Sequence, residues 1–68
     1  MKISARNQLP GTIKAVNPGA INSEVVIDIG GATVVAVITN DSVKRLGLAA
    51  GKKAYAVVKA TDVMVATD

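Results

Sequence analysis

The sequence EVVIDIGGATVVAVIT, residues 24–39, defines the fold class of this chain. Apolar and polar residues alternate with period two from 20 to 29, and Val26 is the exception on the polar face. Gly30-Gly31 is a two-residue hairpin signal, and a nearly continuous β-branched run from 32 to 39 follows it. A strand that is apolar on both faces is either central in its sheet or covered by a neighbouring subunit. The stretch therefore predicts two antiparallel strands and an all-β protein.

Three further strands are predicted from alternation and turn residues. The first covers 8–16, with Ile13 and Ala15 on one face. Asn17-Pro18-Gly19 forms the turn after it, because proline presets φ and glycine accepts the positive φ of a type II turn. The fourth and fifth strands cover 53–59 and 63–65.

One short helix is predicted between the third and fourth strands. Its body is 42–46, Asn40 or Asp41 caps its start, and Gly47 ends it. Five strands in this order predict a five-stranded OB-like barrel. A small SH3-like barrel is the main alternative, since periodicity does not determine topology.

Length and composition predict one small domain, 1–68, that depends on self-association. Burial in a core of this size roughly balances the entropy of ordering the chain. The chain has no cysteine for disulfides and no histidine, and its five carboxylates are scattered, so no metal held directly by side chains is expected. Half of the residues are apolar. We therefore expect an obligate homo-oligomer.

The charge balance and the start of the chain bear on partners and location. Eight basic against five acidic residues give a net charge of +3, a mild preference for anionic partners. No signal-peptide pattern and no apolar run near the roughly 20 residues of a membrane span is present. We expect a cytoplasmic protein without a membrane partner.

Two function classes fit the composition poorly. Without histidine or cysteine, and without an evident carboxylate pair, an enzyme is not expected. OB-like barrels that bind single-stranded nucleic acid stack bases on aromatic side chains, and Tyr55 is the one aromatic residue here. A nucleic-acid-binding or assembly module without oxyanion specificity stays the alternative function.

Two polar segments, 4–7 and 59–61, suit a small oxyanion. A tetrahedral dianion needs convergent donors and no carboxylate among its contacts. Each side chain also has a structural explanation, such as a turn, a cap or a surface charge, and nothing local shows that the segments meet. The predicted donors are the side chains of Ser4, Arg6, Asn7, Lys59 and Thr61 and the main-chain N–H groups around Ala5 and Ala60.

The chain resembles the molbindins, the small Mop-type molybdate-binding proteins. The resemblance lies in Ser-Ala-Arg-Asn-Gln-Leu at 4–9, Asp41-Ser42-Val43 and Lys59-Ala60-Thr61, and it extends over essentially all 68 residues. It implies an OB-like barrel that forms a hexamer, a trimer of dimers, with molybdate or tungstate at subunit interfaces and no organic cofactor. Since the binding module is accompanied by no DNA-reading or nucleotide-binding segment, we expect a role in intracellular molybdenum storage.

The resemblance extends the predicted site in two ways. Thr39 or Ser42 would add a hydroxyl to an oxyanion held by residues 4–6 of one subunit and 59–61 of its partner. Ala60 stands where many relatives have serine, so its N–H would have to serve instead. A second anion site on the three-fold axis is expected to use Gly19, Ala20, Asn22 and Ser23, although these residues are equally explained as the start of a strand.

Overall fold

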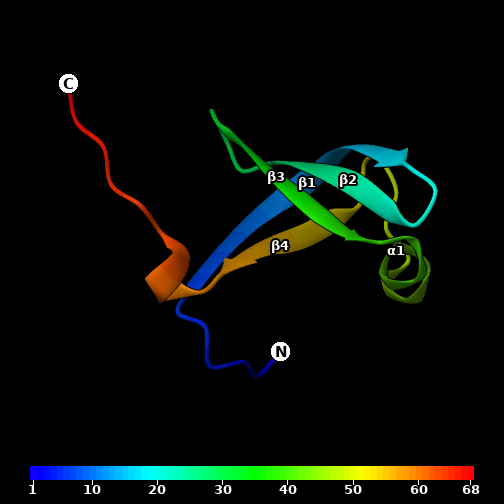
Figure 1. Ribbon diagram of the computed structural model, residues 1–68, viewed down its shortest axis with the longest axis horizontal. Coiled ribbons are helices and arrows are strands. Elements are labelled where there is room, and N and C mark those ends of the chain that lie inside the picture. Colours follow the sequence, from blue (N-terminus) through cyan, green and yellow to red (C-terminus); the bar gives the residue numbers. More distant parts are fainter.

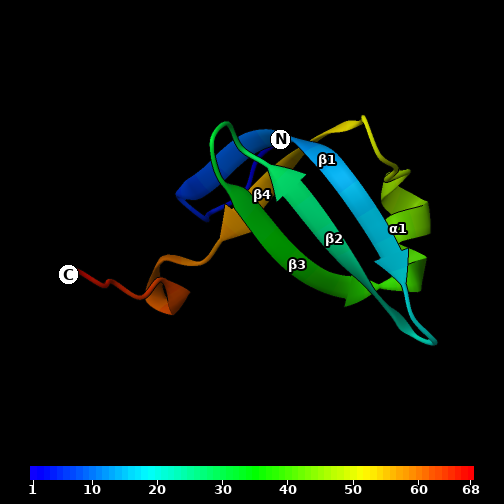
Figure 2. The same ribbon diagram turned by 90° about the horizontal axis from the view of Figure 1, so that it is seen from above.

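The computed structural model describes residues 1–68 and contains one antiparallel sheet with strand order β3-β2-β1-β4 (Figure 1). The α-helix α1 follows β3, and a single 3₁₀ turn, η1, follows β4. The sheet is curled, as Figure 2 shows from above, so the fold is all-β and OB-like. The elements are β1 (Asn7–Pro18), β2 (Asn22–Asp28), β3 (Thr33–Thr39), α1 (Asn40–Leu46), β4 (Lys53–Val58) and η1 (Ala60–Asp62).

The long strand β1 organises the sheet because it pairs with β4 through its first half and with β2 through its second half. The two pairings change over near Thr12, where the β1–β2 register shifts between Ile13 and Ala15. Such a bulge adds one residue, Lys14, and reverses the alternation of faces. The prediction that Ile13 and Ala15 share a face is therefore wrong, and Val16 packs against the core with Ile13 instead.

The core inside the curl is small. Its fully buried apolar residues are Ile13, Val25, Ile27 and Ala56, and partly buried side chains of β3, β4 and α1 pack around them. Outside the core, Val35 and Val37 on β3 keep 57% and 67% of their surface exposed. Because β3 is an edge strand, the first of the two predicted alternatives, a central position in the sheet, is wrong, and cover by a neighbouring subunit stays a prediction.

Gly11 in β1 lies in tight contact with the end of β2. A Cβ atom at this position would lie 2.5 Å from the backbone oxygen of Asp28 and 2.8 Å from Cγ2 of Ile27. The Asp28 oxygen is a backbone atom of the adjacent strand, so it cannot move without displacing that strand. Glycine is therefore required here for close packing of the sheet.

The predicted helix between the third and fourth strands is present, and its start differs from the prediction. Thr39, and not Asn40 or Asp41, is the N-cap, and its hydroxyl accepts from the Ser42 N–H at 3.1 Å. Gly47 ends the helix in the left-handed conformation, with φ 65°, as predicted. The helix begins earlier because the last residue of β3 is itself a capping residue.

The predicted fifth strand is absent, so the sheet has four strands and not five. Residues 63–65 have no sheet partner, because η1 redirects the chain after β4. In η1 the N–H of Asp62 donates to the Lys59 carbonyl at 2.9 Å, and that of Val63 donates to Ala60 at 3.3 Å. The remaining residues extend away from the sheet (Figure 1). Neither helix is long and apolar enough to cross a membrane.

Candidate functional site

The two polar segments predicted to bind an oxyanion flank the same end of the sheet. Asn7 begins β1 and pairs with Val58, the last residue of β4. Residues 4–6 therefore precede, and residues 59–61 follow, one rung of the β1–β4 ladder. We call these two segments together the strand-start cluster: Ser4, Ala5, Arg6, Asn7, Lys59, Ala60 and Thr61.

The cations of the strand-start cluster have no partner within the chain. Arg6 and Lys59 are exposed, and neither side chain makes a hydrogen bond or a salt bridge. Gln8 donates from Nε2 to the Ala5 carbonyl at 2.7 Å. The Ala5 C=O and the Arg6 N–H belong to the same trans peptide group and point in opposite directions. The bond from Gln8 to the Ala5 carbonyl therefore turns the Arg6 N–H away from Gln8. The side chains of Arg6 and Lys59 and the main-chain N–H of Arg6 are thus available to bind an anion. The carboxylate of Asp62 lies one residue beyond the cluster.

The other predicted oxyanion residues, Thr39 and Ser42, form part of the helix start. The Thr39 hydroxyl donates to Ser42 Oγ at 2.9 Å, and Nη2 of Arg45 donates to the same oxygen at 3.2 Å. Nε of Arg45 also forms a salt bridge with Asp41 at 3.1 Å. Both hydroxyls already have partners in the chain, so an anion would bind here by adding contacts to an existing network.

The predicted second-site residues gather beside this helix start. Asn22 pairs with Thr39 across β2 and β3, and the Gly19 N–H donates to the Asn22 carbonyl at 2.8 Å. Ser23 is only 2% exposed and faces the core, so it is not positioned as a surface ligand. We call this group the helix-start cluster: Gly19, Ala20, Asn22, Ser23, Thr39 and Ser42.

The two clusters lie at opposite ends of the sheet within one copy of the chain. In both Figure 1 and Figure 2, α1 is at one end of the sheet and η1 is at the other. The strand β1 links them over 12 residues, which corresponds to a length on the order of 30 Å or more. One copy therefore does not bring Thr39 and Ser42 to Arg6 and Lys59. The predicted oxyanion set divides into two halves, each at its own end.

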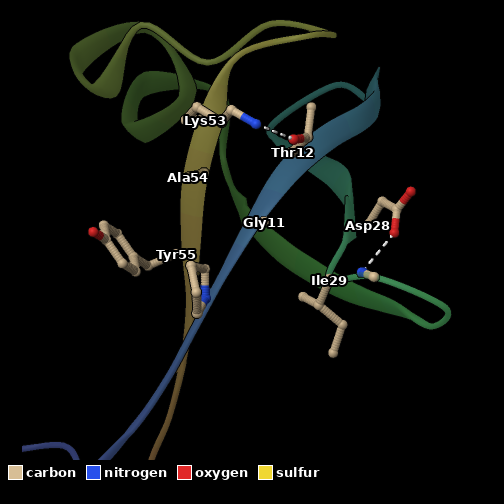
Figure 3. A pocket seen from close by; sticks show the side chains of 9 residues that line it. Gly11, Thr12, Asp28, Ile29, Lys53, Ala54 and Tyr55 are labelled. Atoms are coloured by element: carbon tan, nitrogen blue, oxygen red, sulfur yellow. Dashed lines mark hydrogen bonds between the residues drawn. The ribbon is translucent and has the colours of Figure 1, made fainter.

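A separate surface pocket of about 600 Å³ lies between β1, β4 and the end of β2, where no site was predicted. Its charged groups are already bonded: Lys53 donates to Thr12 Oγ1 at 3.1 Å, and Asp28 accepts from the Gly30 N–H at 2.9 Å. Figure 3 shows the Tyr55 ring directed away from Asp28. Because these side chains do not converge on one point, the pocket is a weaker candidate than the two clusters.

Comparison with known proteins assigns the family. Residues 3–65 match the TOBE domain. The chain belongs to the TOBE-domain family. The match includes both clusters and leaves only two residues at the start and three at the end of the chain outside it.

The TOBE chain is also similar over its whole length to small proteins of the Mop type. It is 49% identical to a probable molybdenum-pterin-binding protein of Haemophilus influenzae, and the match covers 100% of both chains. The solved structure of a molybdate-binding protein from Sporomusa ovata is 45% identical, with a TM-score of 0.92, and the match covers 98% of this chain and 100% of that one. The predicted membership in the Mop-type molbindin family is confirmed.

A third relative is larger than this TOBE chain. The structure of the cytoplasmic molybdate-binding protein ModG with molybdate bound is 54% identical, with a TM-score of 0.83. The match covers 88% of this chain and 43% of the ModG chain. The same fold therefore occurs in a protein more than twice as long.

Asn40 is the residue of the TOBE helix start that the sequence did not single out for the site. Its Nδ2 donates to the Gly19 carbonyl at 2.9 Å, its Oδ1 accepts from the buried Ser23 hydroxyl, and its N–H donates to the Ile21 carbonyl at 2.8 Å. Asn40 thus holds the β1–β2 turn against α1. The sequence offered only a capping signal, since the partners are 17 to 21 residues away.

Proposed function

We propose that this chain binds molybdate at interfaces between its own copies, as one Mop-type domain spanning 1–68. The names of the relatives support the ligand, because the Sporomusa ovata and ModG structures are described as molybdate-binding proteins. The chemistry of the strand-start cluster supports it as well. Arg6 and Lys59 have no partner in the chain, and a dianion between them would accept charge-assisted hydrogen bonds.

The separation of the two clusters is the observation that supports an interface most strongly. Thr39 and Ser42 lie at the α1 end, and Arg6 and Lys59 lie at the η1 end of the same sheet. If all of these groups contact one oxyanion, at least two copies must supply them. An interface would also exclude water, which strengthens hydrogen bonds to the anion.

Exposed apolar side chains support self-association. Besides Val35 and Val37, the residues Ile21, Leu46 and Tyr55 expose more than half of their surface. The buried core has only four apolar members, which is little for an independent fold. We propose a homo-hexamer built as a trimer of dimers, with Gly19, Ala20, Asn22 and Ser23 near the second anion site. For Ser23 the role would be structural, through Asn40.

The proposed biological role rests on residues that bind an anion without catalysing a reaction. The relatives' names describe binding proteins, and the residues proposed here bind and orient an anion without transforming it. We propose storage of molybdenum in the cytoplasm, supported by the name of the cytoplasmic protein ModG. Tungstate is proposed as an alternative ligand, because it is also a tetrahedral dianion, and no organic cofactor is required.

The test is elemental analysis for molybdenum and tungsten on purified protein, followed by calorimetric titration of the anion-free protein with molybdate. We expect elemental analysis to detect bound molybdate or tungstate, titration to show saturable molybdate binding, and sedimentation to give the mass of a hexamer. A single-stranded RNA filter-binding assay at physiological salt serves as the contrasting measurement. RNA binding without molybdate binding would favour the alternative of a nucleic-acid-binding module.

A further inference from the structure

The side chain of Gln8, the second residue of β1, folds back over the segment that precedes the strand. Its Nε2 donates to the Ala5 carbonyl at 2.7 Å, and the bond is partly buried. A carbonyl oxygen only accepts hydrogen bonds, so the Gln8 atom that faces it has to be the amide nitrogen. Leu9, the next residue, packs against the core, which places Gln8 on the outer face of the strand. The conformation of the segment before β1 is thus tied to one side chain.

Carbonyl and N–H groups of the strand-start cluster differ in whether they have partners. The carbonyl oxygens of Ala5, Lys59 and Ala60 all accept hydrogen bonds within the chain. The main-chain N–H groups of residues 4–6 and 59–61 donate to no acceptor in the chain. An anion needs hydrogen-bond donors and is repelled by free carbonyl oxygens. The main-chain groups left free in this cluster therefore include the donors that an anion requires.

We propose that Gln8 is a positioning residue of the oxyanion site and acts through the peptide group between Ala5 and Arg6. This peptide group precedes β1, which begins at Asn7, so no bond of the sheet holds it. The Gln8 amide keeps the Ala5 carbonyl on its own side, and the Arg6 N–H then points to the opposite side. There it donates to the anion that the Arg6 guanidinium also binds. This inference rests on the proposed molybdate binding and names a residue that sets its geometry.

Loss of the Gln8 bond would affect the anion in two ways. Rotation of the freed peptide group removes the Arg6 N–H from the anion, and it brings the Ala5 carbonyl oxygen toward it. Donors that are already oriented before binding cost no reorganisation, and losing one hydrogen bond to a charged group lowers affinity roughly 10- to 150-fold. The bond takes no part in the pairing of β1 with β2 or β4, so we expect the assembly to survive its loss.

A purely structural role for the Gln8 bond predicts a different pattern of effects. The bond would then support the fold near the start of β1, and its loss would weaken all anion contacts of the cluster alike. Positioning concerns one donor, the Arg6 N–H. The contacts made by the other segment, such as the Ala60 N–H, would remain. A measurement that reports each amide separately therefore distinguishes the two roles.

The test variant is Gln8→Met, which keeps the length of the side chain and removes its donor. Thr12→Val is the matched control, because it keeps the side-chain shape, lies in the same strand outside both clusters, and removes the oxygen that accepts from Lys53 at 3.1 Å. Isothermal titration with molybdate gives the affinity, and sedimentation gives the mass of the assembly. We expect roughly 10- to 150-fold weaker binding for Gln8→Met, wild-type binding for Thr12→Val, and an unchanged mass for both.

Amide NMR spectra with and without saturating molybdate provide the measurement for each donor. In the wild-type protein the Arg6 amide proton should move downfield, because its N–H gains a charged acceptor. In Gln8→Met at saturation this shift should be lost, while the shift of the Ala60 amide proton remains. Wild-type affinity of Gln8→Met, or an equal loss of the Arg6 and Ala60 shifts, would overturn the proposal.

The wild-type spectra test the proposal even if Gln8→Met does not fold. An Arg6 amide proton that keeps its position at saturating molybdate, while the Ala60 amide proton moves, would overturn the role of Gln8 and leave the proposed function intact. Failure of the proposed function gives a different result, since wild-type protein would then show no molybdate binding in the titration.

Discussion

Asn40 accepts a hydrogen bond from the buried hydroxyl of Ser23, and so joins the first residue of α1 to the inner face of β2. Asn40→Ala would leave this hydroxyl without its acceptor, and would also remove the bond to the Gly19 carbonyl. An unsatisfied buried polar group costs about 1–3 kcal/mol. We expect the free energy of unfolding to fall by this amount, measured by urea denaturation at fixed protein concentration.

The control for Asn40 is Asn22→Ala. Asn22 is exposed, lies in the same region, and its side chain makes no hydrogen bond in the chain, so we expect a change within about 0.5 kcal/mol. Similar losses for both variants would show that the Ser23–Asn40 bond contributes nothing specific to stability.

Arg6→Ala and Lys59→Ala should each weaken molybdate binding while the assembly survives. Hydrogen bonds to charged groups contribute about 1.5–3 kcal/mol, which corresponds to a loss in affinity of roughly 10- to 150-fold. Isothermal titration gives the affinity, and sedimentation gives the mass. Lys14→Ala is the matched control, because Lys14 is an exposed cation in β1 outside both clusters. Wild-type affinity in both cluster variants would remove these residues from the site.

Sulfate should compete poorly with molybdate. Both are tetrahedral dianions, and the Mo–O bonds of molybdate are longer than the S–O bonds of sulfate. In a site that fits molybdate, sulfate is therefore too small to reach all of the hydrogen-bond donors at once. An affinity difference of tenfold corresponds to about 1.4 kcal/mol, about the net contribution of one hydrogen bond. We expect at least this difference in a competition titration. Equal affinities would indicate a generic oxyanion site.

Gly11→Ala should destabilise the sheet more than a typical strand substitution. The added Cβ would lie 2.5 Å from the Asp28 carbonyl oxygen, and overpacking of this kind costs about 1–3 kcal/mol. For a domain of this size, each kcal/mol lowers the melting temperature by about 4–8 °C. Thermal denaturation at fixed concentration measures the shift. Lys14→Ala in the same strand should change it little, and an unchanged melting temperature for Gly11→Ala would contradict the contact.

Alternation and turn residues were sufficient to predict the four observed strands and the helix between β3 and β4. They were not sufficient for features that depend on distant partners. The bulge at Lys14 reverses the faces of β1 through its pairing with β2, and no local residue signals it. Residues 63–65 have a strand-like composition, yet the η1 turn before them directs the chain away from the sheet.

The candidate site was predictable from the sequence only where it depends on local residues. Polar composition identified 4–7 and 59–61, and the Asn7–Val58 pair places both segments at one end of the sheet. Thr39 was expected as an oxyanion ligand and also proved to be the cap of α1. Which end of the molecule each hydroxyl occupies depends on the antiparallel pairing of the strands, and that pairing cannot be derived from the residues next to Thr39.

The pairing of Asn7 with Val58 also has a consequence for the evolution of larger relatives. It places the start of β1 and the end of β4 at the same end of the sheet. Two domains of this kind can therefore follow one another in a duplicated gene with only a short linker. The ModG chain, of which the match covers 43%, is long enough to hold two such units.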